Sequence, residues 1–441
     1  MQNLTNKKSK TEEKMLAEIV LLGSFIILIL LGVPISFGLG ISSLLSAFAA
    51  GLQPAIIAQR VAAGMQSFPL LAIPLFILAG ALMANGGVAK RMVDLAYVIV
   101  GPLPGGLAIV NCIDSMFFGG VSGSAVADVS STGPMIIPMM VEKGYDKDFA
   151  VALTVASASQ GIIIPPSHNM VIYAMVAGGV SVGKLFLAGY IPGILLGVAL
   201  AIACYFIALK RKYPCEKRPP LKESLHIVVD GILALLCAAI IIVGIAAGIF
   251  TATEASAVAV LYAAFLGFFV FRELKLKDLW PIFMDSVKTT AVVFFLIGCA
   301  SAFGWMMTYL QIPLAVMNFF LSLTNNRFLI LLLVNVLLLL LGMVMDVAPL
   351  IVIVTPVLLP VVKAAGMSEI TFGIVLMLNL GIGLTTPPVG ASLFTGCMIG
   401  KTTIEKVSKA MLPLWPAMLA VLFLVTYVPW FTEFLPNLFM K

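Results

Sequence analysis

The sequence carries very little charge. Only 10% of its 441 residues are Asp, Glu, Lys or Arg, whereas about a quarter of the residues in a soluble globular protein are charged. This composition excludes a soluble enzyme, a disordered chain and a protein that binds nucleic acid. The net charge of +6 comes from basic residues in short polar segments, as in the cytoplasmic loops of membrane proteins.

Residues that usually build catalytic or metal centres are also scarce. The six cysteines are scattered without a CxxC pair, and the two histidines, His168 and His226, are far apart in the sequence, so neither type predicts a metal cluster. The sequence contains no Walker A motif, which argues against ATP hydrolysis by this chain. We therefore do not expect an enzyme.

Long apolar runs are what the sequence has in abundance. Hydrophobic residues make up 61% of the chain and the mean hydropathy is +1.13. At about 20 residues per crossing, this is material for roughly ten to thirteen membrane-spanning helices. The runs are continuous rather than alternating, which disfavours a β-barrel. We predict an all-α polytopic membrane protein with helices at about 17–33, 34–51, 68–84, 148–177, 186–209, 228–248, 252–271, 285–310, 369–399 and 410–432.

The two halves of the sequence repeat each other. PMIIP at residues 134–138 matches PVLLP at 356–360, an offset of 222 residues, and the same offset places Gly161 on Gly383. It also places Pro165-Pro166 on Pro387-Pro388. Matching apolar segments interrupted by Gly and Pro are a sequence pointer to secondary transporters.

We therefore divide the chain into a first repeat at 1–210, a cytoplasmic linker at 211–227 and a second repeat at 228–441. Each repeat is expected to hold one re-entrant hairpin, at about 105–141 and about 327–363. Five crossings lie between these hairpins, and because five is odd, the hairpins open to opposite sides and the repeats are inverted.

Each hairpin is followed by one broken helix, at about 148–177 and about 369–399. Short segments at 88–100 and 312–324 precede the hairpins and are expected to lie in the membrane interface.

Small and hydroxylated residues occupy the middle of the first hairpin. A helix that breaks at Ser122 and Ser124 exposes backbone carbonyls beside two hydroxyl groups, which is tolerated at membrane depth where they line a cavity or bind an ion. Such oxygen atoms suit Na⁺. The alternative is a face of small residues for tight helix packing.

Consecutive prolines break both of the following helices. Proline lacks an amide donor, so carbonyls such as those of Gly161 and Ile164 are freed around Pro166. Gly383, Thr386 and Pro388 occupy the matching places in the second repeat. Two equivalent breaks predict a pair of cation sites near the membrane midplane.

Three carboxylates lie at the ends of apolar runs. Asp346, at the tip of the second hairpin, matches Ser124, and an ionisable residue within a membrane is a functional candidate; the alternative is a solvated tip at the outer interface. Asp128 is expected to cap a helix at 129–141, and Glu254 to cap the helix at 252–271.

With these residues in view, the chain resembles the large membrane (M, DctM-type) subunit of tripartite ATP-independent periplasmic (TRAP) transporters. The resemblance covers almost the whole length. Ala252, where the family often has proline, is a small local departure. The segments that carry the resemblance are 69–76 (PLLAIPLF), 122–128 (SGSAVAD), 138–146 (PMMVEKGYD), 161–167 (GIIIPPS), 253–255 (TEA) and 385–390 (TTPPVG).

The resemblance implies an elevator transporter of the ion-transporter superfamily. Its expected partners are a small four-helix TRAP membrane subunit (Q) and a periplasmic substrate-binding protein (P) that delivers an organic anion. It implies one Na⁺ site at Ser122, Ser124, Gly161, Ile164 and Pro166, and a second at Asp346, Gly383, Thr386 and Pro388. We also predict that Gly123, Ser167 and Thr385, beside these residues, contact the substrate.

The sequence therefore predicts Na⁺-coupled uptake (symport) of a carboxylate-bearing solute, an organic acid, across the bacterial inner membrane and its lipid bilayer. One rival interpretation is a stand-alone Na⁺- or H⁺-coupled anion transporter that needs no binding protein. A channel or passive membrane scaffold is a second rival, and an intramembrane enzyme is a third.

Overall fold

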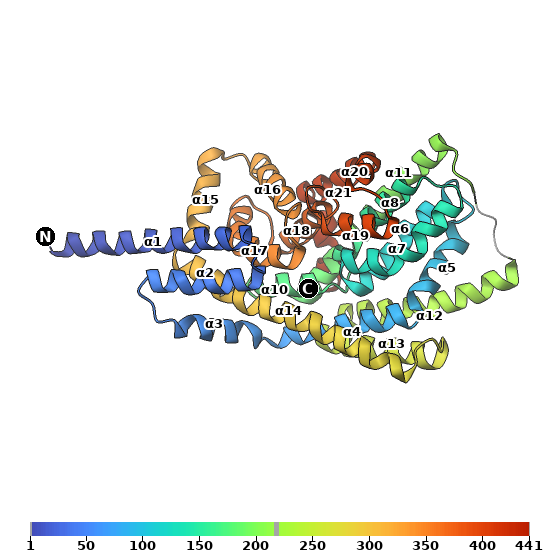
Figure 1. Cartoon of the computed structure of the whole chain (residues 1–441), viewed down its shortest axis with the longest axis horizontal. Helices are drawn as coiled ribbons and strands as arrows, with labels where there is room; N and C mark the ends of the chain where they lie inside the picture. The colour runs from blue at the N-terminus through green and yellow to red at the C-terminus, as the bar shows by residue number, and fades with distance from the viewer. Residues whose placement is uncertain (1, 216–219, 441) are drawn as a thin grey trace.

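The computed structural model describes residues 2–215 and 220–440, with all of their side chains except those of 2–13, 120–122 and 221. Within this part of the chain every regular element is a helix (Figure 1). Six helices are long and apolar enough to cross a membrane, or up to eight when each sharply bent pair counts as one span. The predicted all-α membrane architecture is confirmed.

The helices of the first half follow one another without long gaps. They are α1 (Gln2–Leu30), α2 (Ile35–Ala49), α3 (Ala55–Met65), the short 3₁₀ helix η1 (Phe68–Leu71), α4 (Ala72–Asn85), α5 (Val88–Val100), α6 (Gly106–Ser122), α7 (Ala125–Glu142), α8 (Lys147–Ala158), α9 (Gln160–Ile163), α10 (His168–Val176) and α11 (Val182–Arg211).

The second half has a similar succession of long and broken helices. They are α12 (Leu221–Ala246), α13 (Ala252–Phe265), the π-helical turn η2 (Leu266–Val270), α14 (Leu276–Tyr309), α15 (Ile312–Leu323), α16 (Arg327–Gly342), α17 (Val347–Ala364), α18 (Glu369–Gly383), α19 (Ala391–Gly400), α20 (Ile404–Met411), α21 (Trp415–Tyr427) and α22 (Trp430–Phe439).

The helices are arranged on two sides of the molecule. Figure 1 shows α2, α3, α4, α12, α13 and α14 along one side, and α6 to α8 with α16 to α21 on the other. The short helices α5 and α15 lie at opposite ends of the molecule. The helices of the two predicted hairpins and of the two broken helices are therefore gathered on one side.

Helix boundaries repeat between the halves. Helices α7 and α17 are both 18 residues long, and each end of α17 lies 222 residues after that of α7. Helices α8 and α18 begin at Lys147 and Glu369, again 222 apart. Gly144 and Gly366, between these helices, have φ angles of +88° and +78°, a conformation that glycine adopts without steric cost.

Both predicted helix breaks are present. The axis bends by 49° between the segment Lys147–Ile163 and α10, and residues 384–390 separate α18 from α19. The Pro165–Pro166 and Pro387–Pro388 peptide bonds are both cis. Because prolines supply no amide hydrogen, the helical ladder cannot continue through either pair.

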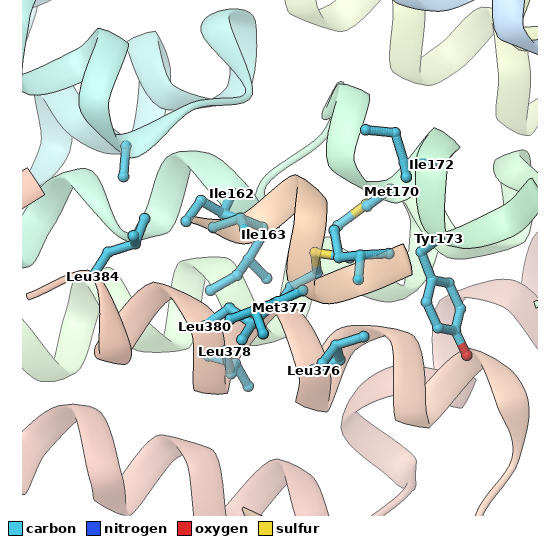
Figure 2. Packing of buried hydrophobic residues seen from close by; sticks show 14 of the residues in the cluster. Ile162, Ile163, Met170, Ile172, Tyr173, Leu376, Met377, Leu378, Leu380 and Leu384 are labelled. Carbon is cyan, nitrogen blue, oxygen red and sulfur yellow. The ribbon is translucent and has the colours of Figure 1, made fainter. Parts of the chain in front are cut away.

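The two broken helices pack directly against each other. Figure 2 shows Ile162 and Ile163 of α9 against Leu380 and neighbouring residues of α18, all buried. Farther along, the Tyr173 hydroxyl donates a 2.5 Å hydrogen bond to the Glu369 carbonyl. The two breaks are thus joined by a continuous apolar core.

Several local expectations need correction. Asp128 does not cap a helix at 129–141, because α7 begins three residues earlier and its N-cap is Ser124. Helix α14 begins at Leu276 rather than at about 285, and α3, α20 and α22 were not predicted. The predicted cap at Glu254 is confirmed as a capping box with Thr251. Residues 216–219 of the predicted linker lie outside the described part of the chain.

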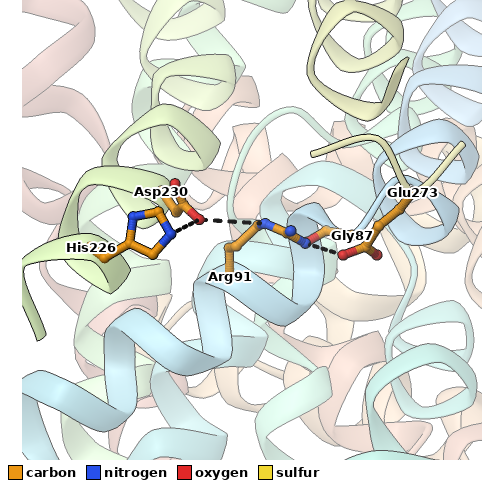
Figure 3. A network of polar contacts seen from close by, with 5 residues as sticks. All are labelled: Gly87, Arg91, His226, Asp230 and Glu273. Atoms are coloured by element: carbon orange, nitrogen blue, oxygen red, sulfur yellow. Dashed lines mark hydrogen bonds and ion pairs between the residues drawn. The ribbon is translucent and has the colours of Figure 1, made fainter. Parts of the chain in front are cut away.

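A polar network ties α5 to its neighbours. The Arg91 guanidinium contacts Glu273 at 2.5 Å and Asp230 of α12 at 4.0 Å, and His226 lies 3.9 Å from Asp230 (Figure 3). The guanidinium also lies 4.0 Å from the centroid of the Phe271 ring. Arg91 thereby connects α5 both to α12 and to the segment that precedes α14.

Candidate functional site

A cavity of about 550 Å³ lies between the two sides of the molecule. Helices α4 and α14 form one wall, and the N-terminal ends of α7, α10 and α17 form the other. Its polar lining includes Ser124, Ser131, His168, Asn169, Thr289 and Asp346. Residues from both hairpin tips line this cavity.

Each hairpin tip presents a helix N-terminus with an oxygen-bearing cap. Ser124 Oγ accepts a hydrogen bond from the Ala127 amide at 3.4 Å, and Asp346 Oδ1 accepts one from the Val347 amide at 2.8 Å. Helix N-termini carry partial positive charge and free amides, which suit anions. Because both capping residues line the cavity, two such termini face the same space.

The first tip packs closely on the first break. A Cβ built on Gly161 would lie only 2.6 Å from the Gly119 Cα, so the backbones of α6 and α9 touch. Beyond the break, Asn169 Nδ2 donates to the Gly123 carbonyl at 3.0 Å. The first hairpin tip therefore contacts the broken helix both before and after the proline pair.

The second tip is held in the same way. A Cβ on Gly383 would lie 2.6 Å from the Gly342 Cα, so α16 and α18 also cross at bare backbone. The carbonyl of Met343, directly after α16, accepts hydrogen bonds from the Val389 and Gly390 amides, both at 3.2 Å. Each repeat thus brings its hairpin and its broken helix into direct contact.

At the breaks, backbone and hydroxyl oxygens have lone pairs that the helical hydrogen bonds do not use. In the first break, Pro165 and Pro166 cannot donate to the carbonyls of Gly161 and Ile162, which are four residues earlier. In the second, the Thr385 and Thr386 hydroxyls both donate to the Ile382 carbonyl, at 2.7 and 2.8 Å.

Since the threonine protons are already used, the oxygen lone pairs are left for a cation. Backbone and hydroxyl oxygens are ligands for a hard cation. The residues present therefore fit an ion such as Na⁺.

Buried polar pairs connect each hairpin to its broken helix farther from the tips. In the first repeat, Asn111 of α6 accepts from the Ser157 hydroxyl at 3.2 Å. In the second, Asn335 of α16 accepts from Asn379 Nδ2 at 2.7 Å. Ser157 and Asn379 are 222 residues apart, so the same contact recurs with different side chains.

The structure brings most of the predicted site residues together, in two groups. Ser124 and Asp346 line the cavity; the close crossings contain Gly161 and Gly383, and the breaks contain Pro166, Ser167, Thr385, Thr386 and Pro388. Gly123 contacts Ser167, since a Cβ built on this glycine would lie 3.1 Å from the Ser167 Cα.

Two predicted residues need separate comment. The side chain of Ile164 packs against Gly193 of α11, so only its backbone could serve a cation. Ser122 ends α6, but its side chain lies outside the described part of the structure.

Sequence reasoning missed His168 and Asn169. Both line the cavity at the start of α10, and Asn169 Oδ1 is buried without a hydrogen-bond partner. The sequence feature that could have indicated them is a pair of polar residues close after the Pro165–Pro166 pair in an apolar run. Asp114, a buried carboxylate in α6, was missed as well.

Comparison with a solved structure identifies the fold. The structure matches that of the Alcanivorax borkumensis YdaH transporter with a TM-score of 0.61 at 16% sequence identity, over 85% of this chain and 88% of that one. The chain therefore shares the fold of that protein.

Sequence comparison identifies the family. The family described as tripartite ATP-independent periplasmic transporter, DctM component, matches residues 22–431. The chain belongs to this DctM family of large TRAP transporter subunits.

Curated relatives agree with this assignment. The Vibrio cholerae sialic acid TRAP transporter large permease protein SiaM is 39% identical over 94% of this chain and 97% of its own length. The Rhodobacter capsulatus C4-dicarboxylate TRAP transporter large permease protein DctM is 36% identical over 96% of this chain and 99% of its own length. The Oleidesulfovibrio alaskensis isethionate TRAP transporter permease protein DctMQ is 42% identical over 93% of this chain and 65% of its own length.

Proposed function

We propose that this chain is the permease subunit that carries an organic anion across the bacterial inner membrane by Na⁺-coupled uptake. The observation that carries this proposal is the single cavity reached by both hairpin tips, Ser124 and Asp346. The relatives' names mention sialic acid, C4-dicarboxylates and isethionate, all organic acids. Two helix N-termini at one cavity are suited to such a substrate.

Na⁺ would bind at the two helix breaks and order the hairpin tips around the anion. Each ligand then favours the arrangement that the other needs, and this coupling is reciprocal. The proposed Na⁺-binding residues are Ser122, Ser124, Gly161, Ile164 and Pro166 at one break, and Asp346, Gly383, Thr386 and Pro388 at the other. Gly123, Ser167 and Thr385, the predicted substrate contacts, do not line the cavity; they would support the hairpin tips that contact the substrate.

The repeats would be inverted across the membrane, with the hairpins and broken helices moving against the long helices as an elevator. Matching helix boundaries and matching glycine crossings in the two halves support this arrangement. The small four-helix membrane subunit and the periplasmic substrate-binding protein would complete the transporter, as the family description as a tripartite system suggests.

Reconstitution into liposomes tests the proposal. The chain is assembled with the small subunit and binding protein from its own gene neighbourhood, and uptake of sialic acid, succinate and isethionate is measured with and without an inward Na⁺ gradient. We expect accumulation of at least one acid only with the gradient. Equal uptake in both conditions would refute Na⁺ coupling.

Two variants address the sites. Ser124→Ala and Asp346→Ala are expected to raise the Na⁺ concentration needed for half-maximal uptake, whereas Asp285→Ala, in an exposed pair on α14, keeps the wild-type value. Uptake by the chain alone, without the binding protein, would instead support a stand-alone transporter.

A further inference from the structure

Two carboxyl groups lie on the two helices of the first hairpin. Asp114 of α6 and Asp128 of α7 are both fully buried, and they lie close enough for their charges to interact. In the part of the chain whose side chains are described, no basic residue forms an ion pair with either. Any negative charge on these two carboxyl groups therefore has no basic side chain beside it to balance it.

Most of the carboxylate oxygens have no hydrogen-bond partner. Asp128 Oδ1 accepts from the Thr132 hydroxyl at 3.2 Å, but Asp128 Oδ2 and both oxygens of Asp114 are buried and unpaired. Buried polar atoms are nearly always paired, and a buried charge needs a counter-charge. Three such oxygens at one place indicate a bound cation.

A neighbouring hydroxyl lies at the same place. Ser115 Oγ is within hydrogen-bonding reach of the Asp128 carboxyl and lies 3.0 Å from Ser157 Oγ. A hydroxyl oxygen has lone pairs in addition to its single proton, so Ser115 can supply one more oxygen ligand.

We propose that Asp114, Asp128 and Ser115 hold a Na⁺ ion in the first hairpin, in addition to the ions at the helix breaks. The protein supplies about four oxygen ligands, fewer than the six to eight that Ca²⁺ takes. Mg²⁺ keeps several of its waters, and fully buried side chains leave little room for them. The inference rests on the proposed use of Na⁺ and adds a site that the break geometry does not contain.

The additional site begins about one helical turn from Ser124, reaches farther into the hairpin, and is confined to one repeat. Asp114 precedes Ser122 by eight residues, which is about 12 Å along a helix. The residues 222 positions after Asp114 and Asp128 are Val336 and Leu350, which have no ligand atoms. The two hairpins would therefore differ in the number of ions that they carry.

Direct measurement of bound ²²Na⁺ tests the proposal. The purified full chain in lipid nanodiscs is saturated with ²²NaCl, and bound ions are counted for wild type, Asp114→Asn, Asp128→Asn and the double variant. We expect each single variant to lose one ion per chain, and the double variant to lose one rather than two, because both carboxylates hold the same ion. Asp285→Asn, an exposed carboxylate, serves as the matched control and keeps the wild-type count.

A fourth variant guards against loss of the fold. Ser115→Ala removes only one oxygen atom and is expected to raise the half-saturating Na⁺ concentration several-fold; melting temperatures in choline chloride show whether each variant is folded. An unchanged count in the aspartate variants, or an unchanged Na⁺ affinity in Ser115→Ala, overturns the proposal.

The same assay separates this inference from the proposed function. The double variant Ser124→Ala/Asp346→Ala, altered at the tips, is expected to retain the hairpin ion. A wild-type chain that binds no Na⁺ refutes both proposals. A wild-type chain that binds Na⁺ with a count insensitive to Asp114→Asn refutes only the hairpin site.

Discussion

Ser159 meets its own counterpart from the other half of the chain. A Cβ built on Gly381 would lie 3.4 Å from the Cβ of Ser159, and the two residues are 222 positions apart, the offset of the repeat. The contacts beside them run in opposite directions, since Ile162 also approaches Gly381 whereas Tyr173 approaches Gly373. A residue that touches its own repeat mate in antiparallel segments is what a local two-fold axis between the halves produces.

The glycine crossings give the first prediction. Gly161→Ala and Gly383→Ala place a methyl group against backbone atoms of Gly119 and Gly342, which cannot rotate away. Overpacking of this kind costs about 1–3 kcal/mol, so we expect a lower melting temperature and weaker stabilisation by Na⁺. Gly23→Ala, where a Cβ has no atom within 4 Å, is the control. Wild-type behaviour of both crossing variants would show that the helices do not meet so closely.

The cavity gives the second prediction. Ala81 lines it from α4, on the wall opposite the hairpin tips, so Ala81→Trp fills substrate space without replacing any proposed Na⁺ ligand. We expect uptake to be lost while Na⁺ still raises the melting temperature. Ala291→Trp introduces the same side chain at an exposed position outside the lining of the cavity and should transport normally. Unimpaired transport by Ala81→Trp would place the substrate path elsewhere.

The buried asparagine of the second hairpin gives the third prediction. Asn335→Ala removes the side chain that hydrogen-bonds both Asn379 Nδ2 and Thr426 Oγ1, and each buried group left unsatisfied costs about 1–3 kcal/mol. Thermal unfolding in nanodiscs should show the loss. Ser130→Ala removes an exposed hydroxyl that bonds only to its own helix and is expected to change the melting temperature little. A stable Asn335→Ala would contradict the importance of this link between hairpin and broken helix.

The Arg91 network gives the fourth prediction. The Arg91 side chain is 18% exposed and joins two acidic side chains and one aromatic ring, so Arg91→Ala is expected to destabilise the α5 attachment. Arg91→Lys should restore the charge but not the planar stacking. Lys288→Ala breaks the pair with Asp285, in which both side chains are about three-quarters exposed; such pairs contribute about 0–1 kcal/mol. Protease accessibility of the α4–α5 turn measures the effect, and equal accessibility in the Arg91 and Lys288 variants would argue against an anchoring role.

Sequence reasoning succeeded where one residue type determines the backbone. The proline pairs at 165–166 and 387–388 located both breaks because proline interrupts the ladder wherever it stands. The apolar runs likewise predicted the long helices. Asp128 was misassigned because a carboxylate near a helix start is usually a cap, and nothing in the sequence shows that Ser124 begins the helix.

Contacts that form only on folding could not be predicted. Asp114 is a single carboxylate in an apolar run of the sequence, and Asp128 approaches it only after the chain turns at the hairpin tip. The closeness of Gly119 to Gly161 likewise depends on how two helices cross. His168 and Asn169 became candidates only when their helix was seen to begin at the cavity.

The glycine crossings also restrict how the permease can work. A joint made of two bare backbones has no side chain that could swivel to loosen it, so it is either closed or pulled apart. In the proposed elevator motion, each hairpin and its broken helix would consequently move as one rigid body. Na⁺ would then be bound or released only when this rigid body reaches one side of the membrane, and not during the movement between the two sides.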